Sequence, residues 1–374
     1  MAASLGTELQ KKQFYFGLKA TDKSVKNYKV VKPTDVIYTK SPIKGFPNGI
    51  IRTSKGESGI VPTLYCVYHS VDEIDSSIIQ SYFEDKERLD AYLMPLVNIG
   101  ARNNVNITDK GFLEGTICIP KDKQEQVSII NVLASISELI TLHQRKCEET
   151  KKLKKYMLQK MFPQNGKRVP EIRFAGFTDD WEQRKLSEIA TMHARIGWQN
   201  LRTSEFLDSG DYMLITGTDF EDGTINYSTC HYVEKERYEQ DKNIQIRNGS
   251  ILITKDGTLG KVAYVQGLTM PATLNAGVFN VEIKDKKETD EKYLFQYLKA
   301  PFLMDYVTRH ATGGTIKHLN QSILINFPVY MPKKSEQEKI GLYLMQLDSL
   351  ITLHQRKYEE LQKIKKFMLQ NMFI

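Results

Sequence analysis

A sequence repeat near the middle and at the end of the chain constrains its fold more than any other feature. Residues 140–163 read ITLHQRKCEETKKLKKYMLQKMFP, and residues 351–374 read ITLHQRKYEELQKIKKFMLQNMFI. At an offset of 211 positions, 17 of these 24 residues are identical, whereas chance gives about one or two matches. The repeat indicates an internal duplication, so we expect the chain to consist of two related halves.

Each copy of the repeat has the pattern of one long amphipathic helix. Both copies are rich in Leu, Lys, Gln, Glu and Met, which favour helices, and Gly341 alone interrupts them internally. Apolar residues recur at three- and four-residue steps, so they form a single apolar seam. The seam comprises Ile129, Leu133, Ile136 and Ile140 in the first copy and Ile340, Leu344, Leu347 and Ile351 in the second.

The length of these helices suggests how the seam is buried. A helix of about 38 residues is roughly 57 Å long, which exceeds the face of a small domain. We therefore expect the two helices to pack against each other, antiparallel and in the manner of a coiled coil. The alternative is that each helix packs only on its own domain.

The remainder of the second half reads as short strands and helices. Residues 164–170 have the composition of a linker, and Asp179-Asp180 can cap a helix at residues 181–189. Strands are expected in YMLITGTDF, GSILITKDGTLGKVAYV and AGVFNVEI, with a tight turn at Asp256-Gly257. A further helix is expected at residues 291–309.

The first half repeats this order, with a strand at residues 35–40, a strand in IVPTLYCVYHS and a helix at residues 84–94. The expected fold class is α+β, with two mixed globules separated by two long antiparallel helices in a pseudo-twofold repeat. The predicted domains are a first globule, a central helix, a linker with the second globule, and a C-terminal helix, at residues 1–120, 121–163, 164–332 and 333–374.

Alignment of the two halves shows that they differ in length. If Lys40 corresponds to Lys255, Met1 falls near Thr216, and the counterpart of roughly residues 169–215 is missing from the first half. We therefore expect the first globule to be truncated at its N-terminus.

Composition and cysteine usage restrict the class of protein. The chain has 52 Lys and Arg against 45 Asp and Glu, a net charge of +7 that is compatible with a polyanionic partner but does not prove one. The four cysteines form no CxxC pair, so neither a zinc site nor a disulfide framework is expected. The start, MAASLGTELQKKQF, shows no apolar core of signal-peptide length, and no stretch approaches 18 apolar residues, so we expect a cytoplasmic protein.

Familiar catalytic motifs are missing from the sequence. It contains no GxGxxG, GxxxxGK[ST] or HExxH motif, and no Asn-Pro-Pro-aromatic or Asp-Pro-Pro-aromatic run for methyl transfer to base nitrogens. The histidines form no ligand-spaced cluster. We therefore expect a protein that is not an enzyme and that holds no metal or cofactor itself.

Basic, amide and hydroxyl side chains in loops are the candidates for DNA contact, because they can bind phosphates or base edges. An ordinary role in turns is the alternative for each of them. The candidates are Lys40, Arg52, Arg102 and Asn103 in the first half and Arg195, Lys255, Thr258, Lys317 and His318 in the second.

Several segments together resemble the specificity (S) subunit of type I restriction-modification enzymes. They are VPEIRFAGFTDDWEQRKLSEI, TKDGTLGKVAYV and TGGTIKHLNQSILINFPV in the second half, GARNNVNIT in the first, and the doubled helix with its LITLHQRK core. These segments extend over nearly the whole chain, and their combination is highly specific.

The resemblance implies a function. Each globule would be a target-recognition domain for one half of a split DNA sequence, and the helices would be the spacer. Proteins similar to this one bind two methyltransferase (M) subunits, which use S-adenosylmethionine to methylate adenine. Restriction (R) subunits add cleavage that depends on ATP, with Mg²⁺ also expected in the partners. A rod of roughly 57 Å would limit the separation of the half-sites to about 17 base pairs.

Three alternatives remain at this point. The chain could be a truncated or decayed specificity protein that binds M subunits through its helices without full DNA readout. It could be an assembly protein that reads no DNA. It could also be a self-contained restriction or modification enzyme, which would require activity from this chain alone, and the missing motifs argue against that.

Overall fold

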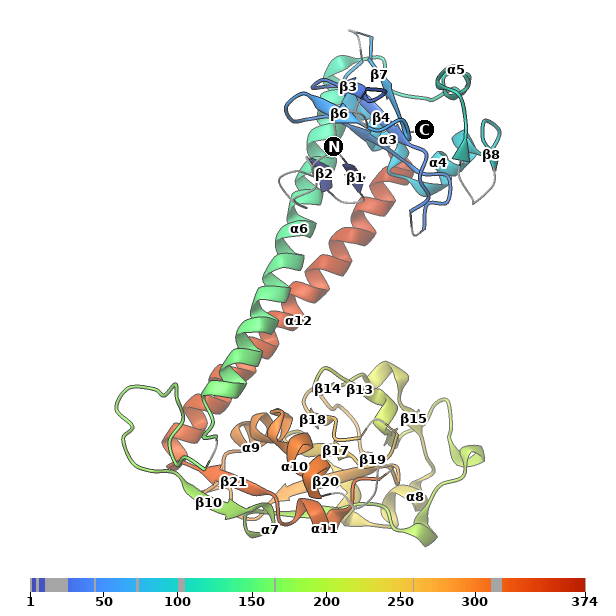
Figure 1. Ribbon diagram of the computed structural model, residues 1–374. Coiled ribbons are helices and arrows are strands. Elements are labelled where there is room, and N and C mark those ends of the chain that lie inside the picture. Colours follow the sequence, from blue (N-terminus) through green and yellow to red (C-terminus); the bar gives the residue numbers. More distant parts are fainter. Residues whose placement is uncertain are drawn as a thin grey trace. The chain divides into compact units, whose positions relative to one another are not determined.

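The computed structural model describes residues 2–4, 7–10, 26–43, 45–71, 74–99, 105–164, 166–257, 259–310 and 318–373. By its internal packing the chain divides into two compact units. The first unit comprises residues 1–145 and 354–374, and the second unit comprises residues 146–353. Each unit combines strands and helices and includes parts of both long helices, so the fold class is α+β (Figure 1).

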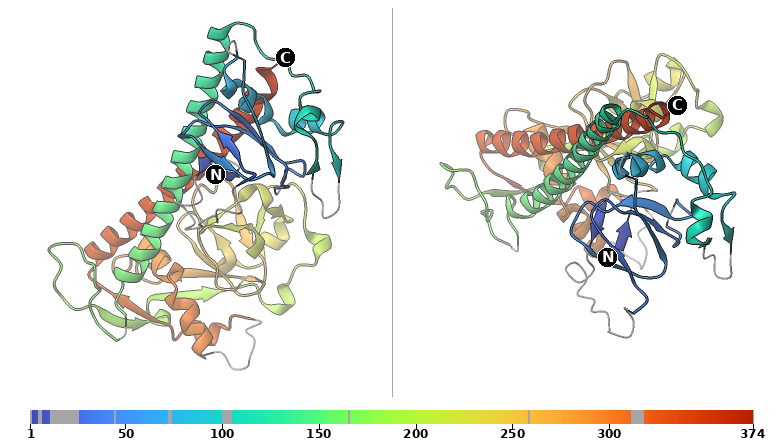
Figure 2. Two further views of the ribbon diagram at one scale, coloured as in Figure 1. Left: turned by 45° about the horizontal axis from the view of Figure 1, so that its top comes forward. Right: turned by 90° about the horizontal axis from the view of Figure 1, so that it is seen from above.

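Among the described residues, two helices are 38 residues long: α6 (Lys123–Lys160) and α12 (Lys334–Asn371). This is the length expected from the repeat, and each helix measures about 57 Å at 1.5 Å per residue. α6 begins in the first unit and ends in the second, and α12 does the reverse. Within each unit, the stretch of α6 lies beside the stretch of α12 (Figures 1 and 2).

In the first unit the two helices run antiparallel. His143 on α6 and His354 on α12 approach with their Nδ1 atoms 3.0 Å apart. Nearer the start of α6, Ile129 shares a buried cluster with Leu369 and Phe373 at the other end of the chain. A rising residue number on α6 therefore meets a falling number on α12.

The second unit shows the same direction. Cys147 Sγ lies 3.8 Å from the carbonyl oxygen of Ile351, and Lys154 Nζ lies 2.5 Å from Asp348 Oδ2.

The seam residues are buried to different extents. Those at the start of each helix are buried, whereas those nearer the middle are half-buried. The buried set is Ile129, Leu133, Ile340, Leu344 and Leu347, and the half-buried set is Ile136, Ile140 and Ile351.

Of the described residues, α6 is the helix whose length and composition would by themselves allow it to cross a membrane. That evidence is weak, because Ile129 and Leu133 on its apolar face pack against Ile78 and Leu369 of the first unit. The apolar content of α6 is thus explained in part by packing within the protein.

The first unit is built on an antiparallel sheet with the strand order β5-β4-β7. One face of this sheet, with short helices, encloses a core that includes Tyr38, Phe83, Leu93 and Phe112. The strands are β4 (Val36–Thr39), β5 (Ile50–Thr53) and β7 (Tyr65–Tyr68), and the helices are α3 (Ser76–Phe83), α4 (Lys86–Leu93) and α5 (Asp109–Phe112). Smaller pairs are β1 (Ala2–Ser4) with β2 (Thr7–Gln10), β3 (Lys29–Val31) with β6 (Gly59–Val61), and β8 (Asn98–Ile99) with β9 (Val105–Asn106).

The second unit contains a four-stranded sheet with the order β11-β20-β17-β18 and another with the order β15-β12-β19-β16. The first sheet comprises β11 (Ala190–His193), β20 (Val278–Ile283), β17 (Ile251–Thr254) and β18 (Val262–Tyr264). The other comprises β15 (His231–Tyr232), β12 (Met213–Ile215), β19 (Ala272–Leu274) and β16 (Gln245–Ile246). Two-stranded pairs are β10 (Glu182–Lys185) with β21 (Pro328–Met331) and β13 (Phe220–Glu221) with β14 (Thr224–Ile225).

The helices of the second unit besides α6 and α12 are short. They are α7 (Leu186–Ile189), α8 (Lys235–Glu239), α9 (Glu291–Lys299), α10 (Phe302–His310) and α11 (Gln321–Leu324). Single 3₁₀ turns lie at Gly197–Gln199, Thr203–Glu205, Gly217–Asp219, Tyr227–Thr229 and Lys242–Ile244. The core between α9, the end of α6 and the start of α12 contains Phe162, Trp181 and Tyr293, whose rings pack edge to face.

Two helix predictions were wrong in detail. Residues 182–185 form strand β10 instead of the start of a helix, because they pair with β21 in the register Glu182↔Met331. The helix expected at residues 291–309 is two helices, α9 and α10, because Pro301 between them has no N–H to continue the hydrogen-bond ladder. Long-range pairing and one proline thus outweighed the local pattern.

The duplication extends from the helices into the globules. The order β5-β4-β7 in the first unit matches β18-β17-β20 in the second, each followed by two helices, a short helix and the long helix. A buried glutamine makes the same contacts at the start of each long helix. Gln126 accepts a hydrogen bond from Asp75 N at 3.2 Å and donates to Pro120 O at 2.8 Å.

In the second unit the glutamine 211 positions later does the same. Gln337 accepts from Asp290 N at 2.9 Å and donates to Pro332 O at 2.8 Å. In both units this side chain ties the long helix to the cap of the helix that precedes it in the globule, since Asp75 caps α3 and Asp290 caps α9.

Candidate nucleic-acid interface

Three of the predicted DNA-contacting residues of the second unit line one cavity of about 420 Å³. Lys255 follows β17, Arg195 follows β11, and His318 precedes α11. The sheet order places β11 and β17 on either side of β20, so residues far apart in the sequence meet at one end of the sheet. The lining also includes Asp256, Phe279, Asn320 and Gln321.

Backbone hydrogen bonds hold Lys255 in place. Its N–H donates to Gly277 O at 2.8 Å, and its carbonyl accepts from Leu319 N at 2.8 Å. The ammonium group lies 5.5 Å from the centre of the Phe279 ring, within range of a cation–π interaction. A half-buried lysine with a fixed backbone can present a positive charge at a defined point.

His318 is exposed and is oriented by an acidic neighbour. Its Nδ1 lies 2.5 Å from Asp256 Oδ1, and the side chain retains 71% of its accessible surface. The sequence identified His318 but treated Asp256 only as part of a turn. The turn itself is confirmed as a β17–β18 hairpin, in which Gly257 and Gly260 both have positive φ.

Arg195 lies in the same cavity wall but directs its guanidinium inward. Its side chain is 1% exposed and donates to Leu274 O at 3.0 Å and to Gln240 Oε1 at 3.1 Å. Burial, together with the charge of Arg237, lowers the pKa of Arg195. We therefore assign Arg195 to the internal hydrogen-bond network and leave it out of the surface proposed to contact DNA.

Two amide residues beside His318 were not among the DNA-contacting residues predicted from the sequence. Asn320 and Gln321 are both exposed and line the cavity, and Gln321 Nε2 donates to Met192 O at 3.0 Å. Amides can make paired hydrogen bonds to adenine edges. Their position directly after the His318 segment was the available signal.

Of the residues predicted in the first unit, the structure describes Lys40 and Arg52, and these two make different contacts. Lys40, the counterpart of Lys255, donates from Nζ to Ile107 O at 2.6 Å, so the same two segments adjoin in both units. Arg52 is 7% exposed, and its Nη1 lies 3.8 Å from Glu84 Oε1. Its side chain lines a different cavity, beside α3. Arg52 is therefore placed inside the unit and not at its surface.

Four predicted residues lie outside the described part of the chain: Arg102, Asn103, Thr258 and Lys317. Among the residues that are described, no group of three or more His, Cys, Asp or Glu side chains could hold a metal ion. The site offers an ammonium, an imidazole and two amides, which suits binding to a phosphate backbone and to base edges.

Comparison with known proteins identifies the family. Residues 178–363 match the type I restriction modification DNA specificity domain. The MjaVIII type I restriction enzyme specificity subunit of Methanocaldococcus jannaschii is 23% identical over 251 residues, which cover 65% of this chain and 58% of that protein. The chain thus spans less than two thirds of the length of this relative.

Solved structures share the fold. The type I restriction-modification S subunit from M. genitalium has a TM-score of 0.62 at 16% identity, over 93% of this chain and 84% of that one. A chain from a structure concerned with complex assembly and conformational transition of the type I restriction-modification system has a TM-score of 0.50 at 18% identity, over 92% and 83% of the two chains. The family match and the curated relative place this chain in the family of type I restriction-modification specificity subunits, with the DNA specificity domain at residues 178–363, and the solved structures show the same fold.

Proposed function

We propose that the chain is the DNA-recognition subunit of a type I restriction-modification complex and that it reads a bipartite target. The observation that carries the proposal is the duplication of one arrangement, a globule followed by a 38-residue helix. Two related readers suit a target made of two half-sites, and the exposed group around Lys255 and His318 supplies the contacts in the second unit.

In this proposal α6 and α12 form an antiparallel, coiled-coil-like spacer between the half-sites. Each helix is about 57 Å long, which limits the separation of the half-sites to about 17 base pairs. The contacts of His143 with His354 in one unit and of Lys154 with Asp348 in the other support antiparallel pairing.

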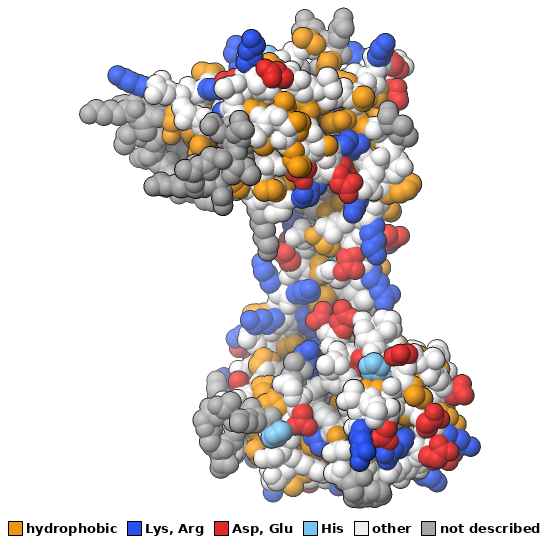
Figure 3. Space-filling view, turned by 90° about the vertical axis from the view of Figure 1, so that its right-hand side faces the viewer, with side chains coloured by type: hydrophobic (Ala, Val, Ile, Leu, Met, Phe, Trp, Pro, Cys, Tyr) orange, Lys and Arg blue, Asp and Glu red, His pale blue; other side chains and the backbone are white. Residues whose placement is uncertain are grey.

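Exposed apolar residues on the long helices support two equivalent docking sites for a partner. The first unit exposes Leu139, Ile364 and Phe367. The second unit exposes the residues at the same repeat positions, Leu350, Leu153 and Tyr156. Exposed apolar side chains on a helix surface mark protein interfaces when they cluster. Figure 3 shows such side chains among the charged groups of the helices.

Because the two sets are equivalent by the repeat, we propose that they bind two copies of one partner, the M subunit, and that R subunits join the complex. S-adenosylmethionine, ATP and Mg²⁺ would then be bound by these partner subunits. The chain would act in the cytoplasm, where its DNA substrate lies, and would supply the sequence address without catalysing a reaction.

The partner proposal is tested by native mass spectrometry of the chain co-expressed with its M subunit. Wild type is expected to carry two M subunits. Phe367→Asp and Tyr156→Asp are each expected to carry one, because each changes one of the equivalent sets. An exposed charged residue, changed in Lys155→Asp, is the control and should leave both copies bound. Two M subunits on every variant would contradict the assignment of these sets.

The DNA proposal is tested by footprinting the assembled complex on DNA that it methylates. Two protected segments separated by an unprotected gap are expected. Lys255→Gln and His318→Gln should each weaken the affinity for one segment by at least about fivefold, since a good base contact contributes about 1–3 kcal/mol. Protection of one continuous segment would argue against a bipartite reader.

A further inference from the structure

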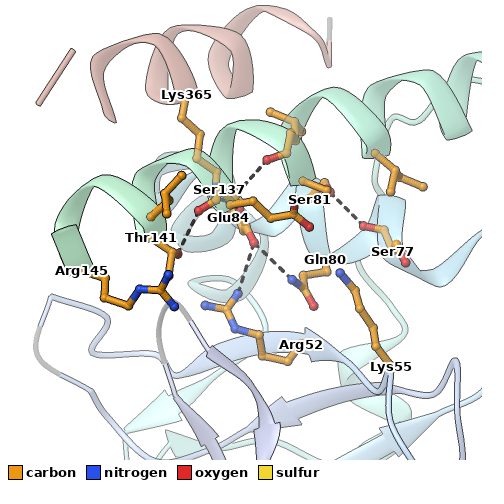
Figure 4. A pocket seen from close by; sticks show the side chains of 15 residues that line it. Arg52, Lys55, Ser77, Gln80, Ser81, Glu84, Ser137, Thr141, Arg145 and Lys365 are labelled. Carbon is orange, nitrogen blue, oxygen red and sulfur yellow. Dashed lines mark hydrogen bonds and ion pairs between the residues drawn. The ribbon is translucent and has the colours of Figure 1, made fainter. Parts of the chain in front are cut away.

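The first unit contains a cavity of about 400 Å³ that the proposed DNA-recognition role does not use. Side chains from β5, α3, α6 and α12 point into this space (Figure 4). All of the lining residues belong to the first unit. A cavity of this volume lies within the range that holds small organic ligands.

In the second unit, charged and amide side chains meet at the equivalent place. Lys154, at the repeat position of Lys365, lies 2.5 Å from Asp348 Oδ2. Asp348 also accepts from Gln296 Nε2 at 2.7 Å and lies 3.3 Å from Lys299 Nζ. The first unit carries serines, Ser137 and Ser81, at the positions of Asp348 and Gln296. The missing side-chain volume is one reason for the cavity.

The second reason for the cavity is the distance at which the globule helix can approach the long helix. A Cβ placed on Gly341 would lie 2.7 Å from the backbone nitrogen of Tyr293, so α9 lies directly against α12 at this glycine. The first unit has Ile130 at the position of Gly341. An isoleucine side chain has no room in an approach as close as that of α9 to Gly341, and Ile130 lines the cavity.

Cationic side chains predominate around the cavity. Arg52, Lys55, Arg145 and Lys365 line it, against Glu84 and Glu138, so the lining carries a net charge of two positive. Lys365 Nζ lies 2.6 Å from Glu84 Oε2. Burial alone would raise the pKa of Glu84, but Lys365 and Arg52 outweigh it and hold the pKa below its ordinary value. Glu84 therefore stays ionised and keeps these cations at the cavity.

Hydroxyl groups and apolar atoms complete the lining. Ser81, Ser137 and Thr141 donate their hydroxyl protons to backbone carbonyls of their own helices, which leaves their oxygens available as acceptors. Leu133 and Leu142 provide an apolar wall. The cavity thus offers cations at one part and apolar surface at another.

From these features we propose that the cavity binds a small phosphate monoester. The phosphate group would be held by Arg145, Lys365 and Arg52, and the organic part would lie against Leu133 and Leu142. A phosphate monoester carries about −1.5 to −2 charges near pH 7, opposite in sign to the excess of cationic side chains in the lining. The volume exceeds that of a phosphate ion alone, which favours an ester over the free anion.

Isothermal titration of the full chain with ribose 5-phosphate tests the proposal, with ribose and inorganic phosphate as comparison ligands at matched ionic strength. Saturable binding of the ester is expected, weaker binding of inorganic phosphate, and no binding of ribose. Arg145→Gln should weaken binding at least fivefold. Ser137→Asp, which copies Asp348 of the second unit, should weaken it at least tenfold, because a carboxylate would take the place of the phosphate.

Arg356→Gln is the matched control, since Arg356 has the repeat position of Arg145 but is exposed and does not line the cavity. It should change binding less than twofold. If Ser137→Asp does not fold, two measurements still test the proposal: binding of the ester by Arg145→Gln, and the increase in the thermal stability of wild type when the ester is added. Absence of saturable binding, equal binding by ribose, or unchanged binding in Arg145→Gln would overturn the proposal. Displacement of the ester by duplex DNA would also overturn it, because the phosphates would then come from the DNA backbone.

Discussion

In both units, matching contacts anchor the start and the end of the long helices, whereas the charged pairs along the helices differ. Gln126 and Gln337 make matching hydrogen bonds at the helix starts. At the helix ends, Phe373 packs edge to face on Tyr82 with ring centres 5.5 Å apart, and Phe162 packs on Tyr297 at 5.1 Å. Between these anchors the pairings change. The duplicated scaffold is therefore held by its ends, and the middle was free to diverge.

The charged pairs of the middle show this divergence. Lys154 of the second unit pairs with Asp348 on the other long helix, whereas Lys365 of the first unit pairs with Glu84 of the globule. A charged position beside the shared glutamine at the helix start differs as well: Glu336 of the second unit is 1% exposed and is paired with Arg173, while Glu125, its repeat counterpart, is exposed. One helix sequence can thus serve two globules because its charged side chains find different partners.

The largest effect is expected from a substitution at Gly341, where α12 closely approaches α9. Gly341→Ile should destabilise the protein by at least about 3 kcal/mol, since the side chain would meet the backbone of α9. The reverse change in the first unit, Ile130→Gly, should cost about 2 kcal/mol, from helix propensity and lost apolar contact. Urea unfolding monitored by circular dichroism measures both. Equal costs would show that the two units pack alike at this position.

The next effect tests the shared glutamines. Gln337→Leu should destabilise by about 3 kcal/mol and Gln126→Leu by about 2 kcal/mol, because buried backbone groups lose their partners. The larger value for Gln337 follows from its additional hydrogen bond to Glu288 O at 3.0 Å. Gln362→Leu, at an exposed position on α12, is the control and should change stability by less than about 0.5 kcal/mol. A reversed order for the two glutamines would contradict the comparison.

The smallest expected effect is the pH dependence of the free energy of unfolding that arises from Lys154, the buried lysine of the second unit. Burial and the neighbouring Lys299 lower the pKa of Lys154 to about 7, against the opposing effect of Asp348. Between pH 7 and the ordinary lysine pKa, the unfolded chain keeps a proton that the folded chain has released. The free energy of unfolding therefore rises with pH in this range, by up to about 1.4 kcal/mol per pH unit.

Lys154→Met removes this contribution. Between pH 7 and pH 9 the free energy of unfolding should rise more for wild type than for the variant. Below pH 7 the difference between the two free energies should be constant. Lys155→Met, at the exposed neighbouring position, should follow wild type at every pH. Parallel curves for wild type and Lys154→Met would contradict the burial of a lysine with a lowered pKa.

The sequence predicted the features that depend on local pattern and on the repeat. The 38-residue helices followed from good helix formers and a three- to four-residue apolar spacing. The β17–β18 hairpin followed from Asp256-Gly257 between apolar runs. The burial of Arg195 could not be predicted, because it depends on acceptors as distant as Gln240 and Leu274.

The cavity beside α3 was also beyond the sequence pattern. It arises from differences at aligned positions, such as Ile130 against Gly341 and Ser137 against Asp348, whose consequences depend on how closely two helices approach. The pairing of His318 with Asp256 joins residues 62 positions apart and was missed for the same reason. Contacts between distant segments decide such features, and spacing along one sequence does not report them.

Exchange of one recognition segment tests the central claim most directly. Residues 191–320 are replaced by the corresponding segment of another family member, the chimera is co-expressed with the M subunit, and methylated adenines are mapped by sequencing genomic DNA. We expect one half of the methylated target to change while the other half and the spacing remain, because α6 and α12 are unaltered. An unchanged methylation target, or a change in both halves, would contradict a reader with two separate recognition units.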